Sequence, residues 1–314
     1  MPVVALHALD YGLKSTNAPL NLLDDLSVMT PGSHNYLSQR LRLHYVDWGN
    51  PDAPPLVLLH GARDHCRSWD WLAATLSKHW HVIAPDLRGH GDSEWSQDGH
   101  YGMEAFVYDL ARLIEDQQLA PLRLVGHSLG GNICLRYAGI YPERVHKLVS
   151  IEGIGPSPAI IAQEEQVTIA DRLQKWIAEQ HDMSVRTTRR YPTIDAAVQR
   201  MQHANPHLSM EQAQHLTQHG VRRNDDGTYS WKVDPYLNSW TTVDITRAQI
   251  ESLWARISCP TLMIYGKNSW ASNPQDDGRM QKFPTATLTT VEQAGHWIHH
   301  DQPQQVLTLL RDFL

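Results

Sequence analysis

The chain is 314 residues long, with 41% apolar residues, 19% charged residues and a formal net charge of −7. This composition predicts a protein that is globular throughout and that buries a sizeable core. The acidic balance, without any run of clustered Lys and Arg, argues against nucleic acid as a partner and fits poorly with an anionic membrane surface.

The N-terminal segment MPVVALHALDYGLK has no basic region ahead of an apolar stretch. Nowhere do about 18 apolar residues follow one another, as a membrane span would require. We therefore expect neither a secretion signal nor a membrane span, and a cytoplasmic location. The three cysteines, Cys66, Cys134 and Cys259, are an odd number at wide spacing. They predict reduced, buried thiols rather than disulfides or metal ligands.

Residues 1–38 contain Pro, Asn and Ser with one short apolar patch, and they predict an extension lying on the folded domain. Residues 40–46 (RLRLHYV) then alternate between polar and apolar side chains, which is typical of a half-exposed strand. The turn residues Gly49, Asn50 and Pro51 follow. This strand and turn are typical of the antiparallel strands with which a mixed sheet begins.

Four short apolar runs recur between helical patterns, at residues 56–60, 81–86, 122–127 and 147–152. Their apolarity is continuous rather than alternating, which favours strands that are covered on both faces. The pattern therefore predicts a parallel sheet with crossover helices.

The alternation of strands and helices stops after residue 152. Residues 153–245 are rich in Gln, His, Arg and Ala at helical spacing and predict a helical insertion without a buried strand. The alternation returns with apolar runs at 261–266 and 286–292 and a closing amphipathic helix at 302–314. We expect a core of residues 39–152 and 246–314, with the insertion forming a cap over the site where such sheets bind ligands.

The most informative motif is Gly126-His127-Ser128-Leu129-Gly130-Gly131. It directly follows the apolar run LRLV and opens a helical pattern. A serine in such a tight turn projects its hydroxyl above the sheet, and the flanking glycines leave room for the turn. The strand–turn–helix context predicts an exposed nucleophile at Ser128.

Together with three further motifs, this turn makes the chain resemble the α/β-hydrolase superfamily from about residue 40 onward. The matching segments are His60-Gly61, residues 85–93 (PDLRGHGDS), the Ser128 turn and Gly295-His296-Trp297. The resemblance implies a mostly parallel eight-stranded sheet with helices on both faces and an inserted helical cap.

The resemblance also implies roles for individual residues. Ser128 is the expected nucleophile and His296 the general base that removes its proton. The backbone N–H groups of Ala62 and Leu129 are the expected donors to the oxyanion formed during acyl transfer.

The third member of the expected triad departs from the commonest pattern. Most relatives carry Asp three or four residues after the glycine that ends the seventh strand, but here Gly266 is followed by Lys-Asn-Ser-Trp. Glu152, at the end of the sixth strand, is our predicted acid, since some branches of the superfamily place the acid there. Asp276 or Asp277 is the second possibility. The third is that the chain has no intact triad acid.

Several side chains near these positions are candidates for substrate contact, namely Arg63, His127 and Trp297. Arg63 lies in a polar loop where an internal Arg–Asp network explains the charges equally well. His299 and His300 complete an H-x-x-H-H spacing with His296, but no cluster of carboxylates or cysteines accompanies them in the sequence. We therefore expect neither a metal nor a cofactor.

A serine at this turn excludes the relatives that use an aspartate nucleophile, the epoxide hydrolases and haloalkane dehalogenases. The sequence therefore predicts a serine hydrolase that cleaves a small-molecule carboxylic ester or lactone through an acyl-enzyme. The alternatives are a C–C bond hydrolase or cofactor-free haloperoxidase on the same triad, a ligand-sensing protein that keeps the fold, and a scaffold without activity. A homo-oligomer is compatible with the sequence.

Overall fold

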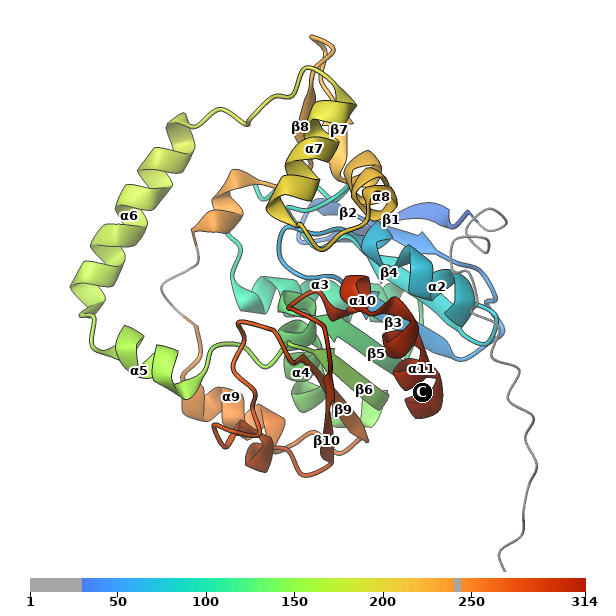
Figure 1. Ribbon diagram of the computed structural model, residues 1–314. Coiled ribbons are helices and arrows are strands. Elements are labelled where there is room, and N and C mark those ends of the chain that lie inside the picture. Colours follow the sequence, from blue (N-terminus) through green and yellow to red (C-terminus); the bar gives the residue numbers. More distant parts are fainter. Residues whose placement is uncertain (1–29, 240–243) are drawn as a thin grey trace, which may run out of the picture.

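A single eight-stranded sheet lies at the centre of the computed structural model, which describes residues 30–239 and 244–314 (Figure 1). Its strands follow the spatial order β1-β2-β4-β3-β5-β6-β9-β10. They are β1 (Gly32–Ser38), β2 (Leu41–Asp47), β3 (Pro55–Leu59), β4 (His81–Pro85), β5 (Leu122–His127), β6 (Val145–Ile151), β9 (Thr261–Gly266) and β10 (Ala286–Val291).

The sheet is parallel from β4 through β10, whereas β1 and β2 enter it in antiparallel pairing. The central strands are buried almost along their whole length, which is why their sequences read as continuous apolar runs. The predicted mostly parallel eight-stranded sheet is confirmed.

The predicted boundary at residue 38 is wrong, because residues 32–38 belong to the sheet as β1. This edge strand, GSHNYLS, pairs with β2 along its whole length and buries only Tyr36 and Ser38. A strand with so few buried positions carries no apolar pattern, so sequence alone gave no sign of it. The rest of the predicted extension, residues 1–29, lies outside the described residues.

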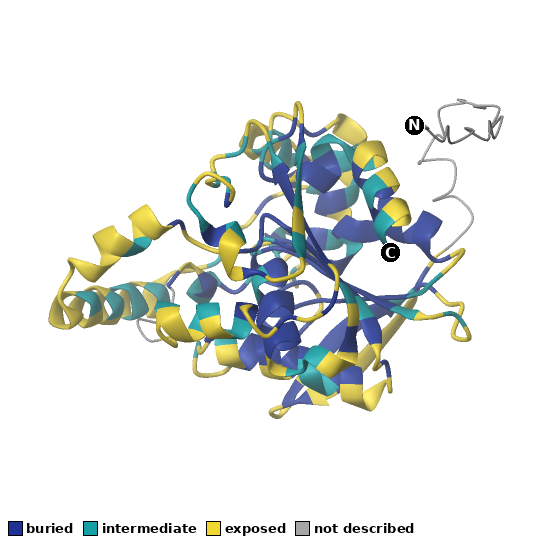
Figure 2. Cartoon of the chain, turned by 90° about the horizontal axis from the view of Figure 1, so that it is seen from below, coloured by how far each residue is buried: buried dark blue, intermediate teal, exposed yellow. Residues whose placement is uncertain are grey.

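Helices cover both faces of the sheet, as predicted. One face carries α3 (Met103–Asp116), α4 (Leu129–Ile140) and α9 (Arg247–Trp254), whose apolar side chains share a core with the strands. The other face carries α2 (Asp70–Leu76), preceded by the 3-10 helix η1 (Cys66–Trp69), and α11 (Pro303–Phe313). Figure 2 shows the strands as the most buried part of the molecule.

The insertion between β6 and β9 contains α5 (Pro158–Glu165), α6 (Ile169–Val185), α7 (Ile194–Ala204) and α8 (Met210–Gly220). It also contains a short hairpin, β7 (Val221–Arg223) and β8 (Tyr229–Trp231), and the 3-10 helix η3 (Pro235–Asn238). The prediction of an insertion without a buried strand missed this hairpin, because three-residue strands are too short to show periodicity.

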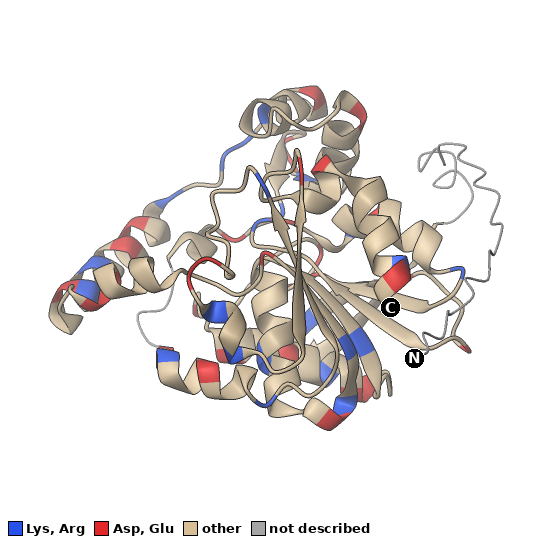
Figure 3. Ribbon diagram, turned by 60° about the horizontal axis from the view of Figure 1, so that its bottom comes forward, with Lys and Arg blue, Asp and Glu red and all other residues tan. Residues whose placement is uncertain are grey.

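The two halves of the insertion differ in how they contact the core. Helices α7 and α8 pack on Trp71 of α2 through a small apolar cluster that includes Leu216. Helix α6 has no fully buried residue, and it carries both acidic and basic side chains (Figure 3). In Figure 1 it stands apart from the sheet. No helix in the described part of the chain is long and apolar enough to cross a membrane.

Candidate active site

The carboxyl end of β5 leads into α4 through a strained turn at Ser128, whose φ is 50° and ψ is −115°. Close packing explains the glycines beside it. A Cβ on Gly126 would lie 2.5 Å from the Gly130 carbonyl carbon, and a Cβ on Gly130 would lie 2.5 Å from the Leu59 oxygen. The Ser128 N–H donates to the Ile151 carbonyl at 2.8 Å, which holds the turn against β6. Strain of this kind is a recurring property of functional turns.

Glu152 and His296 meet at the same edge of the sheet. The Glu152 carboxylate accepts a hydrogen bond from His296 Nδ1 at 2.5 Å, and both residues are buried. Glu152 itself has a positive φ of 50°, and its N–H donates to the Ile264 carbonyl of β9 at 3.0 Å. These backbone constraints direct the carboxylate toward the loop that carries His296.

The loop after β9 supports the same carboxylate. The Gly266 N–H donates to Glu152 Oε1 at 2.9 Å, and the Ser269 hydroxyl donates to Oε2 at 2.6 Å. Hydrogen bonds to a carboxylate stabilise its ionised form. Ser269 stands where most relatives carry Asp, and the sequence analysis did not identify it as a site residue.

Neither of the two alternative acids hydrogen-bonds to His296. Asp277 is paired with the buried Arg279 guanidinium at 2.7 Å, and Arg279 in turn donates to the Gly155 carbonyl. Asp276 is exposed. The loop after Gly266 therefore does not fold back to restore the commonest arrangement.

His127, a predicted substrate contact, is buried, with only 1% of the residue exposed. Its Nε2 donates to the His296 carbonyl at 2.9 Å, and the two rings lie 4.8 Å apart. Burial, reinforced by the neighbouring His296, lowers the pKa of His127 to about 3. His127 is thus a neutral ring that supports the backbone of His296, and Ser128 is the next residue along the chain.

No hydrogen bond joins the Ser128 hydroxyl to Nε2 of His296 in this structure. Such contacts often form fully only when substrate is bound.

The two predicted oxyanion donors lie on segments that flank Ser128. Leu129 is the first residue of α4, where a helix has a free N–H and a partial positive charge. Ala62 follows Gly61, and a Cβ on Gly61 would lie 3.3 Å from Ser128 Cβ. That close approach brings the loop after β3 against the serine.

Exposed aromatic side chains surround His296. Trp297 is 38% exposed, and its ring lies 5.2 Å from the His296 ring. Trp270, which the sequence analysis missed, is 76% exposed and lies 4.6 Å from His296. Arg63 is exposed, and its backbone N–H donates to His90. Trp297 and Arg63 therefore remain candidates for substrate contact.

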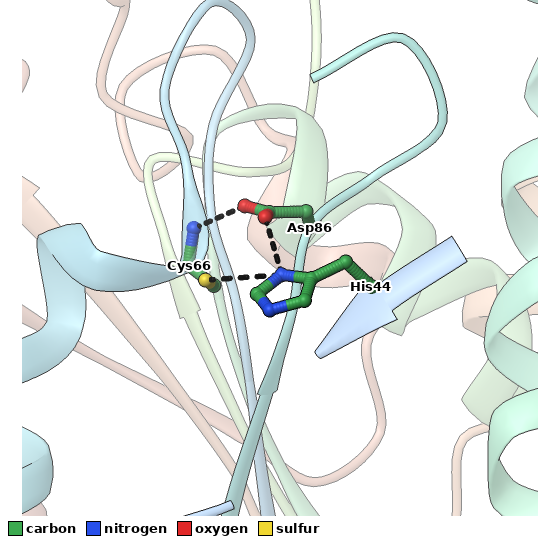
Figure 4. Close-up of side chains that lie close together, drawn as sticks. All are labelled: His44, Cys66 and Asp86. Atoms are coloured by element: carbon green, nitrogen blue, oxygen red, sulfur yellow. Dashed lines mark hydrogen bonds and ion pairs between the residues drawn. The ribbon is translucent and has the colours of Figure 1, made fainter. Parts of the chain in front are cut away.

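A second cluster, His44, Cys66 and Asp86, has the residue types of a cysteine nucleophile site (Figure 4). Its contacts are wrong for that role. Asp86 accepts from His44 Nδ1 at 2.7 Å, and the Cys66 sulfur approaches the same nitrogen, leaving no base for the thiol. Burial raises the pKa of Cys66 well above its ordinary value, so the thiol stays protonated. This cluster is a structural network that holds the loop after β3.

Comparison with known proteins agrees with this fold. The alpha/beta hydrolase fold family matches residues 54–303. A serine hydrolase-like protein of Danio rerio is 27% identical over 85% of this chain and 83% of its own length. Esterase Rv0045c of Mycobacterium tuberculosis is 26% identical over 85% of this chain and 84% of its own length.

Among solved structures, the thioesterase domain from the curacin biosynthetic pathway superposes with a TM-score of 0.77 at 24% identity. The match covers 90% of this chain and 99% of that domain. With a family match over most of its length, the chain belongs to the α/β-hydrolase fold family.

Proposed function

We propose that this protein is a serine hydrolase that cleaves a carboxylic ester or lactone through an acyl-enzyme. The observation that carries the proposal is the 2.5 Å hydrogen bond between Glu152 and His296 beside the strained turn at Ser128. The two curated relatives described above, one named an esterase and one a serine hydrolase-like protein, support the reaction class.

In the first half of the reaction, His296 Nε2 takes the proton of the Ser128 hydroxyl while Oγ forms a bond to the substrate carbonyl carbon. The carbonyl oxygen becomes an oxyanion that accepts hydrogen bonds from the N–H groups of Ala62 and Leu129. When the intermediate collapses, the C–O bond to the alcohol breaks, and the leaving oxygen takes the proton from Nε2.

In the second half, water attacks the acyl carbon while His296 takes one of its protons. The bond to Ser128 Oγ then breaks, Oγ regains a proton from Nε2, and the carboxylic acid leaves. Glu152 accepts a hydrogen bond from Nδ1 throughout. It thereby fixes the tautomer that leaves Nε2 free to act as base, and it stabilises the imidazolium that forms in each half.

The cap, residues 153–245, is proposed to govern substrate choice, since all proposed triad members and oxyanion donors come from the core. The C–C bond hydrolase and haloperoxidase alternatives use the same triad and are separated only by substrate. The Glu152–His296 hydrogen bond and the strained turn at Ser128 favour an enzyme over the ligand-sensing and inactive alternatives.

The proposal is tested by measuring turnover of p-nitrophenyl acetate and butyrate and of a panel of lactones. A serine-directed fluorophosphonate should abolish turnover and label Ser128, identified by peptide mass spectrometry. Labelling at another residue, or the absence of both turnover and labelling in folded protein, would contradict the proposal. Turnover of a dienoate ketone but of no ester would favour the C–C bond hydrolase.

A further inference from the structure

A cluster of metal-ligating residue types lies behind the candidate active site. Asp64 comes from the loop after β3, two residues beyond Ala62, whereas His299 and His300 come from the short helix α10 (Ile298–Asp301), just after His296. One ligand atom from each of the three lies within 4.8 Å of the others. The three residues are 9%, 1% and 6% exposed, so the cluster is internal.

The polar atoms of this cluster lack partners. Asp64 Oδ2, both ring nitrogens of His299 and Nε2 of His300 are buried and make no hydrogen bond within the described part of the chain. The other oxygen of Asp64 accepts from the His65 N–H at 2.8 Å. Buried side-chain polar atoms nearly always have a partner, so four unpartnered atoms in one place indicate a missing one.

The charge of the cluster is also uncompensated. The Asp64 carboxylate is buried between His299 and His300. No Lys or Arg within the described ranges forms an ion pair with it. A buried carboxylate without a counter-charge is strongly unfavourable.

We propose that Asp64, His299 and His300 bind a divalent transition-metal ion, with Zn²⁺ as the representative ion. Neutral imidazole nitrogens and a carboxylate oxygen are ordinary zinc ligands, and three of them leave one tetrahedral position for a water. A bound ion needs ligand distances of roughly 2.0–2.2 Å, so the three ligand atoms must move closer together when it binds.

Two other clusters of potential ligands occur among the described residues, and they fit a metal less well. In the first, His44, Cys66 and Asp86 already satisfy one another. In the second, which consists of Asp70, His215 and His219, the Asp70 carboxylate is paired with Arg67 at 2.7 Å. A guanidinium there both neutralises the carboxylate and repels a cation.

A metal at Asp64, His299 and His300 would join the loop that carries Ala62 to the helix that follows His296. Because the folded protein holds the ligands together and the unfolded chain does not, binding would raise the midpoint of thermal unfolding. The inference does not depend on the proposed ester hydrolysis, and its test does not measure activity.

The experiment starts from full-length protein stripped with EDTA, then incubated with Zn²⁺ and passed through gel filtration. Mass spectrometry of the eluted metal should find about one Zn²⁺ per chain, and thermal unfolding should shift upward. His299→Gln, His300→Gln and Asp64→Asn should each weaken Zn²⁺ binding by roughly tenfold or more. The matched control, His215→Gln with His219→Gln on α8, should leave binding unchanged.

Circular dichroism checks that each variant is folded. If a variant does not fold, X-ray absorption of the wild-type zinc complex decides instead, since the proposal requires two imidazoles and a carboxylate oxygen around the ion. Wild-type protein that retains no Zn²⁺, even after refolding with the ion present, overturns the inference. So does Zn²⁺ binding that survives in the three cluster variants or is lost in the α8 control.

Discussion

The hydroxyl of Ser269 donates a 2.6 Å hydrogen bond to the same Glu152 oxygen that binds His296. Ser269 lies three residues after Gly266, in the loop where most resembling enzymes carry Asp. In this chain the carboxylate comes from the end of β6, and the loop after β9 contributes a donor to it.

This hydrogen bond predicts that a carboxylate at position 269 can replace the carboxylate of Glu152 as the partner of His296. Glu152→Gln should lose most activity, and adding Ser269→Asp to it should restore activity by roughly tenfold or more, because a carboxylate again lies near His296 Nδ1. Ser269→Asp alone should be impaired, since two adjacent carboxylates repel. The measurement is kcat for p-nitrophenyl butyrate.

Ser272→Asp in the Glu152→Gln background is the control, because Ser272 lies in the same loop but hydrogen-bonds to Asp277. Equal recovery in both double variants would show that any added negative charge suffices, and the positional argument would fail.

Removing either reacting side chain should abolish turnover while preserving the fold. Ser128→Ala and His296→Ala should each lower kcat by roughly 10⁴–10⁶, as loss of a nucleophile or base does in other triads. Steady-state ester hydrolysis with active-site titration checks the size of the loss. A His296→Ala enzyme that keeps a tenth of wild-type kcat would place the base elsewhere.

The acid should matter less than the base, because an unoriented imidazole still accepts a proton. Glu152→Gln should therefore lower kcat by roughly 10²–10⁴, with a smaller effect on KM. Asp276→Asn and Asp277→Asn are the comparison variants and should retain near-normal kcat in folded protein. Unfolding of Asp277→Asn is checked separately, because Asp277 is paired with the buried Arg279.

Motifs with a fixed local geometry could be recognised from the sequence, and contacts between distant loops could not. The Ser128 turn and the four buried runs predict the sheet because their patterns depend on neighbours in the chain. Glu152 was identified because it ends a strand. Ser269 and Trp270 were missed because an ordinary loop serine or tryptophan has no local signal. Asp64 is separated from His299 by most of the chain, so its approach depends on the fold.

Several buried histidines should make stability depend on pH. Burial lowers the pKa of His90 and His127 from 6.5 to about 3. The unfolded chain therefore binds protons below pH 6.5 that the folded chain does not, and stability falls as pH drops from about 6.5 toward 3. Each such histidine adds a slope of up to ~1.4 kcal/mol per pH unit near pH 5.

Urea unfolding at a series of pH values measures this slope. His127→Phe should reduce the pH dependence of the unfolding free energy by the contribution of about one histidine proton. A slope that is flat between pH 6.5 and 5 would mean that these rings are not buried neutral in the folded protein.

The aromatic side chains beside His296 should contact the leaving alcohol, because His296 donates its proton to that oxygen. Trp270 is almost fully exposed, so Trp270→Ala should leave the fold and the phosphonate labelling of Ser128 intact. It should raise KM for benzyl acetate by roughly 3–10-fold, the size expected for losing one aromatic contact, and affect cyclohexylmethyl acetate less.

These two esters have similarly poor leaving groups, so the comparison isolates ring stacking from chemical reactivity. Tyr108→Ala, an exposed aromatic residue on α3, is the matched control and should change neither KM. If Trp270→Ala lowers kcat for both esters equally and leaves KM unchanged, Trp270 orients the His296 ring instead of binding the alcohol.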